Sequence, residues 1–347
     1  MNRAPPPARR LIHALRGALA SLRRRSGAPL AEGVRAEPDG GPAATEASGF
    51  REFSYRSAAG SRDYMLLLPA RRPAAPMPLV VMLHGCTQSP ADFATGTRMN
   101  RYAEEQGFAV AYPAQSRAQN ASLCWNWFQR SNQVRGRGEP AIIAGLTSEL
   151  VATHGFDRTR VYIAGLSAGG TMAAIVGQAY PEIYAAIGVH SGVRPGIAVD
   201  LSSGLAAMRR GAVLPLDARA QEPSGSVTAD KTPTIVFHGD ADSAVHPQHA
   251  AEISARAVRA FVSAAAKGAK PPRESVESGV APGGHAFTRT AWTQPDDTTV
   301  AELWLVHGFG HAWSGGDAAG SFADPQGPDA SREMLRFFAA HRVGASA

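Results

Sequence analysis

The segment Val161-Tyr-Ile-Ala-Gly-Leu-Ser-Ala-Gly-Gly170 decides the fold of this 347-residue chain. Its apolar, β-branched and aromatic start predicts a buried strand, and the Ala-rich stretch 171–180 that follows predicts a helix. Between them, Gly165 and Gly169 flank Ser167, so that a strand, a sharp turn with an exposed serine and a helix form a nucleophile elbow. The alternative, a glycine-rich loop with an incidental serine, is disfavoured because the sequence on both sides fits the elbow.

Strand and helix patterns alternate along the rest of the chain. After an opening β-hairpin at 50–55 and 63–69, apolar runs predict strands at 79–83, 108–113, 160–164, 184–190, 234–239 and 300–306. Further helices are predicted at 92–106, 141–154, 250–266 and 331–340. The alternation predicts an α/β fold whose mostly parallel central sheet is covered by helices on both faces.

Composition divides the chain into an arm and one folded domain. Residues 1–48 hold eight arginines against four acids and end in an Ala-, Gly- and Pro-rich linker, so we expect a disordered or weakly helical arm there. Residues 49–345 are expected to form the domain, with 191–232 as an insertion or cap. The chain outside the arm carries 27 basic and 25 acidic residues, and this near balance argues against nucleic-acid binding.

The sequence leaves the cellular compartment open. No stretch approaches the ~18 apolar residues that span a bilayer, so no transmembrane segment is expected. Arg16 interrupts the apolar part of the N-terminus, and residues 23–25 are arginines where an export signal would have a small-residue cleavage site. These features argue against export, whereas the positions of the two cysteines argue for an oxidising location.

A serine nucleophile needs a base, and the base needs an acid to orient it. After an elbow these partners follow in the order acid, then histidine, on loops after later strands. The loop after the next-to-last predicted strand holds Asp240 and Asp242, of which we expect Asp242 to be the acid and Asp240 to brace the turn. The loop after the last one holds His307, which could point into the core, and His311, which is free to approach Ser167. We therefore predict a Ser167–Asp242–His311 triad.

Four other histidines have simpler interpretations. His84 and His238 each precede a glycine at the end of a predicted strand and are expected to stabilise the turns there. His246 and His249 have a spacing that a metal could use, but no further Cys, His or Asp cluster accompanies them. A helix start explains this pair better, and we expect neither a metal nor a cofactor.

Ester and amide chemistry also requires donors for a tetrahedral oxyanion. One donor is expected to be the backbone N–H of Ala168, and the other the N–H of Cys86 in the loop after 79–83. Two free thiols would be usual in a cytosolic enzyme. Because Cys124 lies in the loop over the neighbouring strand, we hypothesise instead a Cys86–Cys124 disulfide that fixes the oxyanion loop.

Five motifs in order resemble the polyhydroxybutyrate depolymerase family of esterases, a branch of the α/β-hydrolases related to feruloyl and acetylxylan esterases. The motifs are Leu-His-Gly-Cys-Thr-Gln (83–88), Cys-Trp-Asn-Trp-Phe (124–128), Gly-Leu-Ser-Ala-Gly-Gly (165–170), His-Gly-Asp-Ala-Asp (238–242) and Gly-His-Ala-Trp-Ser-Gly-Gly (310–316). The resemblance implies the α/β-hydrolase fold, the same triad and the same oxyanion donors. It also makes Trp125, Trp127 and Trp313 candidates for the walls of an apolar substrate cleft, with core packing as the alternative.

The resemblance implies a serine carboxylester hydrolase that acts on poly- or oligo(3-hydroxyalkanoate) esters through an acyl-enzyme. Because no polymer-binding module follows the motifs, small or oligomeric soluble esters are the expected substrates. A feruloyl- or acetylxylan-type esterase is the second hypothesis. The third is a catalytically silent binding protein that keeps the fold.

Overall fold

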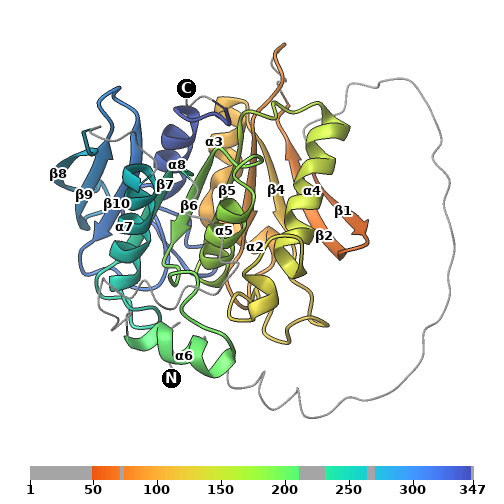
Figure 1. Ribbon diagram of the computed structural model, residues 1–347, viewed down its shortest axis with the longest axis horizontal. Coiled ribbons are helices and arrows are strands. Elements are labelled where there is room, and N and C mark those ends of the chain that lie inside the picture. The colour runs from red at the N-terminus through yellow and green to blue at the C-terminus, as the bar shows by residue number, and fades with distance from the viewer. Residues whose placement is uncertain (1–48, 71–73, 211–230, 264–269, 345–347) are drawn as a thin grey trace, which may run out of the picture.

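A ten-stranded sheet runs through the centre of the part of the chain that the structure describes (Figure 1). The computed structural model describes residues 49–70, 74–210, 231–263 and 270–344. The predicted arm at 1–48 and residues 211–230 of the predicted insertion lie outside the described residues. In order across the sheet, the strands are β1 (Gly49–Ser57), β2 (Gly60–Leu68), β4 (Ala109–Pro113), β3 (Leu79–Leu83), β5 (Val161–Leu166), β6 (Ala186–His190), β7 (Thr234–Gly239), β10 (Thr299–Val306), β9 (Ala286–Thr293) and β8 (Arg273–Val280).

The central strands β4, β3, β5, β6, β7 and β10 run parallel, which confirms the predicted mostly parallel sheet. Antiparallel hairpins extend it at both edges, β1–β2 on one side and β8–β9 on the other. In β3, Leu79, Val81 and Leu83 face one core cluster, whereas Val80 and Met82 face the other. All five are fully buried, which explains why this strand is a continuous apolar run.

Helices cover both faces of the sheet. One face carries α4 (Gly138–His154), α5 (Ala168–Ala179) and α7 (Gln248–Ser263), and the other carries α2 (Pro90–Thr97), α3 (Met99–Gln106) and α8 (Ala330–Ala339). The described residues also form the 3-10 helix η1 (Arg130–Asn132) and the helix α6 (Leu201–Arg210). Among the described residues, no helix combines the length and the apolar character needed to cross a bilayer.

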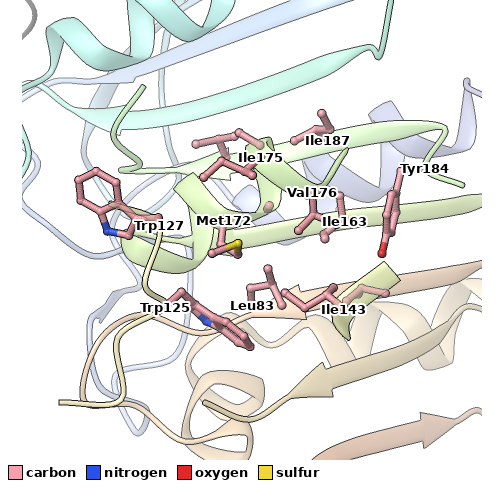
Figure 2. Packing of buried hydrophobic residues seen from close by; sticks show 14 of the residues in the cluster. Leu83, Trp125, Trp127, Ile143, Ile163, Met172, Ile175, Val176, Tyr184 and Ile187 are labelled. Atoms are coloured by element: carbon pink, nitrogen blue, oxygen red, sulfur yellow. The ribbon is translucent and has the colours of Figure 1, made fainter. Parts of the chain in front are cut away.

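The core between the sheet and α5 fixes the position of the elbow (Figure 2). Ile163 on β5 and Ile187 on β6 are fully buried, and Val176 of α5 belongs to the same cluster. A Cβ atom on Gly177 would lie 2.4 Å from Ile187 Cγ1, so α5 approaches the sheet more closely than any other residue would allow. The helix that follows the serine is therefore held tightly against its own strand.

The predicted single helix at 92–106 is wrong, because the structure has two helices there. Arg98 adopts a left-handed conformation with φ 56° and separates α2 from α3. Gly96 in the last turn of α2 packs against the backbone of Gly320, and its carbonyl accepts a hydrogen bond from Asp317 N at 2.9 Å. Tertiary contacts with the distant loop at 317–320 thus accompany the break, and the helical spacing of the sequence did not reveal them.

The hairpin β8–β9 was not predicted either, since no strand is expected from the sequence between the helix at 250–266 and the strand at 300–306. Seven of the eight residues of β8 are exposed, so the strand lacks the apolar alternation that predicts a half-buried sheet. A short parallel pair, β11 (Trp313–Ser314) and β12 (Ala323–Asp324), follows β10 and was not predicted either.

Glu302, fully buried on β10, connects the β8–β9 hairpin to α8. Its two carboxylate oxygens accept hydrogen bonds from Arg289 on β9 at 2.8 and 3.0 Å and from Arg336 on α8 at 2.7 Å. Trp304 Nε1 donates to the same carboxylate at 3.1 Å. Burial alone would raise the pKa of Glu302, but the hydrogen bonds and charges of the two arginines outweigh it and lower this pKa below its ordinary value.

We predict that Glu302→Gln lowers the free energy of unfolding by about 2–3 kcal/mol at pH 7, measured by urea denaturation. Breaking a fully buried ion pair typically costs about 3–5 kcal/mol. The expected loss is smaller here, because Arg336 is partly exposed to solvent. Since the pKa of Glu302 is lowered in the folded protein, the stabilisation is present above the ordinary glutamate pKa and is lost as the pH falls. The difference between the two proteins should therefore shrink below about pH 4.

The control is Glu333→Gln, which removes a more exposed partner of Arg336 and should cost less than about 1 kcal/mol. Equal stability of the wild type and Glu302→Gln at pH 7 would show that the ion pairs of Glu302 with Arg289 and Arg336 do not stabilise the fold.

Candidate active site

Ser167 lies on the sharp turn between β5 and α5, as the sequence predicts for an elbow. Its backbone has φ 58° and ψ −119°, a conformation that residues other than glycine rarely adopt. Two hydrogen bonds hold this strained turn, from Ser167 N to His190 O at 2.8 Å and from Thr171 N to Ser167 O at 2.9 Å. The turn thus places the serine at the carboxyl end of the central strands.

The two glycines of the elbow are sterically required. A Cβ atom on Gly165 would lie 2.5 Å from the backbone of Gly169 and 2.6 Å from Leu83 O. A Cβ atom on Gly169 would lie 2.1 Å from Leu83 O and 2.5 Å from His84 O. The elbow therefore packs directly on the end of β3, where the predicted oxyanion loop begins.

Asp242 and His311 form a buried pair at the same end of the sheet. Asp242 lies after β7 and His311 after β10, and Asp242 Oδ2 accepts a hydrogen bond from His311 Nδ1 at 2.6 Å. Asp242 Oδ1 accepts hydrogen bonds from Ala244 N and Val245 N at 2.8 and 2.9 Å. Burial would raise the pKa of Asp242, but the His311 charge and the hydrogen bonds it accepts hold this pKa well below its usual range.

The serine hydroxyl and the imidazole are not joined by a hydrogen bond within the described residues. Both nevertheless belong to loops at the carboxyl ends of the parallel strands, since Ser167 follows β5 and His311 follows β10. Hydrogen bonds between a nucleophile and its base are often long in unliganded enzymes and shorten when substrate binds. The hydrogen bond between Ser167 Oγ and His311 Nε2 would therefore have to form when substrate binds.

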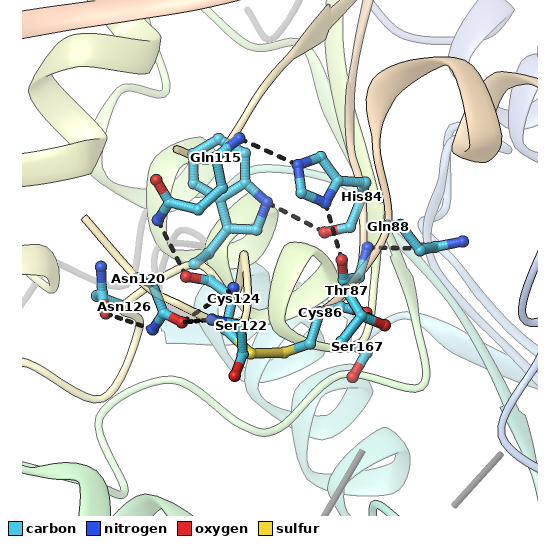
Figure 3. Close-up of a disulfide and its surroundings, with 12 residues drawn as sticks. His84, Cys86, Thr87, Gln88, Gln115, Asn120, Ser122, Cys124, Asn126 and Ser167 are labelled. Carbon is cyan, nitrogen blue, oxygen red and sulfur yellow. Dashed lines mark hydrogen bonds between the residues drawn. A yellow bond between two sulfur atoms is a disulfide. The ribbon is translucent and has the colours of Figure 1, made fainter. Parts of the chain in front are cut away.

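The loop at 84–88 presents an unused donor beside the serine. In the described part of the chain, the N–H groups of Cys86 and Ala168 have no hydrogen-bond acceptor. Both residues line one cavity with Ser167, and Figure 3 shows Ser167 beside Cys86. Two unpaired N–H groups at a nucleophile are the arrangement that an oxyanion hole requires.

A disulfide between Cys86 and Cys124 ties this loop to the loop at 114–129 (Figure 3). The two residues are 38 positions apart, and their Cα atoms are separated by 4.2 Å. Thr87, with φ 68°, donates its N–H to Ser122 O at 2.8 Å. Gln88 Oε1 accepts a hydrogen bond from Gly85 N at 2.8 Å. The backbone on both sides of Cys86 is therefore fixed.

A buried polar network that the sequence analysis missed supports the loop that carries Cys124. Glu139 Oε2 accepts a hydrogen bond from Asn126 N at 2.7 Å, and its other oxygen accepts from Arg62, Asn126 and Gln115 side chains. Arg62 also lies over the Trp125 ring, 5.4 Å from its centroid. Asn126 and Trp125 belong to the motif at 124–128, but Arg62, Gln115 and Glu139 lie in none of the quoted motifs, so only spatial proximity reveals the network.

The tryptophans predicted as cleft walls differ in their surroundings. Trp127 lines the cavity beside Ser167. Trp125 is fully buried and donates its Nε1–H to His84 O at 3.0 Å, and Trp313 is 1% exposed and donates to Ser331 Oγ at 3.1 Å. For Trp125 and Trp313 the burial and the hydrogen bonds agree with the alternative of core packing, because their rings brace loops and do not line this cavity.

The predicted insertion supplies most of the cavity wall that the sequence analysis missed. The cavity is bounded by Leu201, Leu205 and Met208 of α6, by Val193 before it and by Phe128. The three α6 side chains are spaced by four and three residues and so share one helix face, a pattern that could have indicated their role. The resulting wall beside the serine is apolar.

The remaining histidines and Asp240 have structural partners. Asp240 accepts hydrogen bonds from His307 Nδ1 at 2.8 Å and from Gly308 N at 2.7 Å, so it braces the histidine loop as expected. His307 does not point into the core, because its side chain is 40% exposed. His249 bonds to Ala207 O through Nε2 at 2.9 Å. Among the described residues there is no cluster of three or more His, Cys, Asp or Glu side chains that could hold a metal.

The chain matches one family model and is similar to several known esterases. Residues 62–282, more than half of the chain, match the family model described as "Esterase PHB depolymerase". The poly(3-hydroxyalkanoate) depolymerase C of Paucimonas lemoignei is 28% identical over 247 residues, which cover 70% of this chain and 56% of that protein. The feruloyl esterase B of Thermothelomyces thermophilus is 30% identical over 184 residues, 50% of this chain and 62% of that protein.

The chain spans about half the length of these relatives. Among solved structures, the acetyl xylan esterase from Aspergillus awamori superimposes with a TM-score of 0.58 at 19% identity, covering 80% of this chain and 94% of that chain. This likeness identifies the fold as that of the α/β-hydrolases, as the sequence motifs imply. With the family model matching from β2 to β8 and over the elbow, the chain belongs to the Esterase PHB depolymerase family.

Proposed function

We propose that the protein is a serine carboxylester hydrolase in which Ser167 is the nucleophile, His311 the base and Asp242 the orienting acid. The buried hydrogen bond of 2.6 Å between Asp242 and His311, at the sheet end that carries the strained serine, is the observation that supports this most directly. Because Asp242 remains charged, it accepts a hydrogen bond from the Nδ1–H of His311. The Nε2 lone pair of His311 is then available to take the serine proton.

The proposed reaction follows from these positions. His311 Nε2 takes the proton from Ser167 Oγ as the oxygen bonds to the ester carbonyl carbon, and the carbonyl oxygen becomes an oxyanion. The free N–H groups of Cys86 and Ala168 would donate to that oxyanion. The alcohol then leaves with the proton from His311, and water, activated by the same imidazole, hydrolyses the acyl-enzyme.

Poly- or oligo(3-hydroxyalkanoate) esters are the proposed substrates. A depolymerase of that class is among the relatives with the widest coverage of this chain, and the cavity beside Ser167 has apolar walls suited to aliphatic acyl groups. Similarity to feruloyl and acetylxylan esterases supports the second candidate, an esterase that acts on polysaccharide side chains. Since disulfides persist in oxidising compartments, we place the protein outside the reducing cytosol.

The choice of acid can be tested with Asp242→Asn and Asp240→Asn, assayed on p-nitrophenyl butyrate. Asp242→Asn should lower kcat by about 10³-fold or more, because His311 would lose its charged orienting partner. Asp240→Asn removes a brace outside the triad and should cost less than about tenfold. Ser167→Ala sets the background rate and should leave the circular dichroism spectrum unchanged. The reverse ranking of the two asparagine variants would assign the acid to Asp240.

The disulfide is expected to support both stability and rate. Closing a loop of 38 residues stabilises a fold by about 4 kcal/mol, so Cys86→Ala/Cys124→Ala should unfold at correspondingly lower urea concentration. Its kcat should fall by about 10–100-fold, because the Cys86 N–H is held less rigidly. Thiol titration provides the direct check: the wild type should show no free thiol when unfolded without reductant and two after reduction. Two reactive thiols without reductant would contradict the bond.

A substrate panel separates the two proposed activities. Hydroxybutyrate dimers and trimers, methyl ferulate and acetylated xylan are compared by kcat/KM with the same enzyme preparation. We expect the hydroxybutyrate oligomers to exceed methyl ferulate by at least about tenfold, since the cavity beside the serine is small and apolar. Preferential release of ferulate or of acetate from xylan would favour the second candidate.

A further inference from the structure

A second histidine contacts the proposed catalytic acid. His238, at the end of β7, is fully buried, and its Nε2 lies 3.3 Å from Asp242 Oδ2 and 3.0 Å from Val245 O. Its other ring nitrogen, Nδ1, is buried and has no hydrogen-bond partner among the described residues. From the sequence, His238 is expected only to stabilise the turn at the strand end, and the triad does not use it.

The surroundings of His238 determine which nitrogen carries the proton. Both neighbours of Nε2, a carboxylate and a carbonyl oxygen, can only accept hydrogen bonds, so Nε2 must carry the proton and donate. Nδ1 then carries a lone pair that meets no donor, and a second proton on it would meet no acceptor. A buried polar atom without a partner destabilises the fold, so the unpartnered Nδ1 offsets part of the stabilisation that the Nε2 hydrogen bonds provide.

We infer that His238 is a positioning residue for the reaction proposed above, on which this inference rests. Its Nε2–H shares Asp242 Oδ2 with His311 Nδ1, while the other oxygen of Asp242 is held by Ala244 N and Val245 N. The carboxylate is thus fixed from β7, from its own loop and from the histidine loop. His238 orients Oδ2 toward His311 and disperses part of its negative charge.

The other titratable groups around His238 are two buried histidines. His190, at the end of β6, accepts a hydrogen bond from Ser314 N at Nε2, and burial lowers its pKa well below the ordinary value. His249, at the start of α7, donates to Ala207 O, and burial lowers its pKa to about 4. Both rings are neutral around pH 7, so Asp242 and, when protonated, His311 are the charged groups that His238 affects.

The test compares His238→Met with His238→Gln, with rates normalised to the serines that a fluorophosphonate probe labels. Methionine fills the space but donates nothing, so kcat/KM should fall about tenfold with KM nearly unchanged. The acid limb of the pH–kcat/KM profile should move to higher pH, because a carboxylate that accepts one hydrogen bond fewer stabilises protonated His311 more strongly. The melting temperature should change little, because methionine removes the unpartnered Nδ1 but also leaves Val245 O without its donor. Glutamine can place an N–H where Nε2 lies and should retain the wild-type profile.

His341→Met is the matched control, because His341 is also buried with an unpartnered ring nitrogen but packs near the amino end of β5. It should leave the pH profile unchanged. Should His238→Met fail to fold, His238→Asn replaces it, since the shorter amide reaches only the Nδ1 position and should show the same loss. A wild-type pH profile in His238→Met, or in His238→Asn where that variant replaces it, would overturn the inference. Absence of probe labelling in the wild type would instead overturn the proposed function.

Discussion

The close packing of the elbow on the end of β3 is the constraint on which the rest of the site depends. Gly165 and Gly169 bring the backbone of the turn against the carbonyl oxygens of Leu83 and His84 at a distance that excludes any side chain. At this contact the backbone of Ser167 is strained, with φ 58° and ψ −119°. The contact also sets the Cys86 N–H beside the Ala168 N–H, so one steric condition positions both the nucleophile and the two free donors.

Rigid support for that contact comes from residues far from it in the sequence. The disulfide, the Trp125–His84 hydrogen bond and the Glu139 network hold the loops at 84–88 and 124–128 together. Burial lowers the pKa of His84 to about 4, so its neutral ring accepts Gln115 N at Nε2 and donates to Gly85 O from Nδ1. These hydrogen bonds and the disulfide connect the two loops, which makes the oxyanion loop a fixed element.

The apolar wall of the cavity is coupled to the loop of the proposed acid. His246 N donates to Met208 O at 2.8 Å, and His249 donates to Ala207 O, so the last turn of α6 is capped by residues that follow Asp242. Gly204 lets α6 approach the Trp127–Phe128 loop, since a Cβ atom there would lie 3.0 Å from Phe128 Cβ. The part of the predicted insertion that the structure describes is therefore an integral wall of the site.

The α/β class, the elbow at Ser167 and the buried strands can be predicted from the amino-acid sequence, because each depends on local chemistry: continuous apolar runs, and glycines where a turn must be tight. The break at Arg98, the exposed hairpin β8–β9, the core positions of Trp125 and Trp313 and the contact of His238 with Asp242 become visible in three dimensions. These features depend on contacts between segments distant in sequence, and a tryptophan or histidine has the same local pattern whether it lines a cavity or braces a loop.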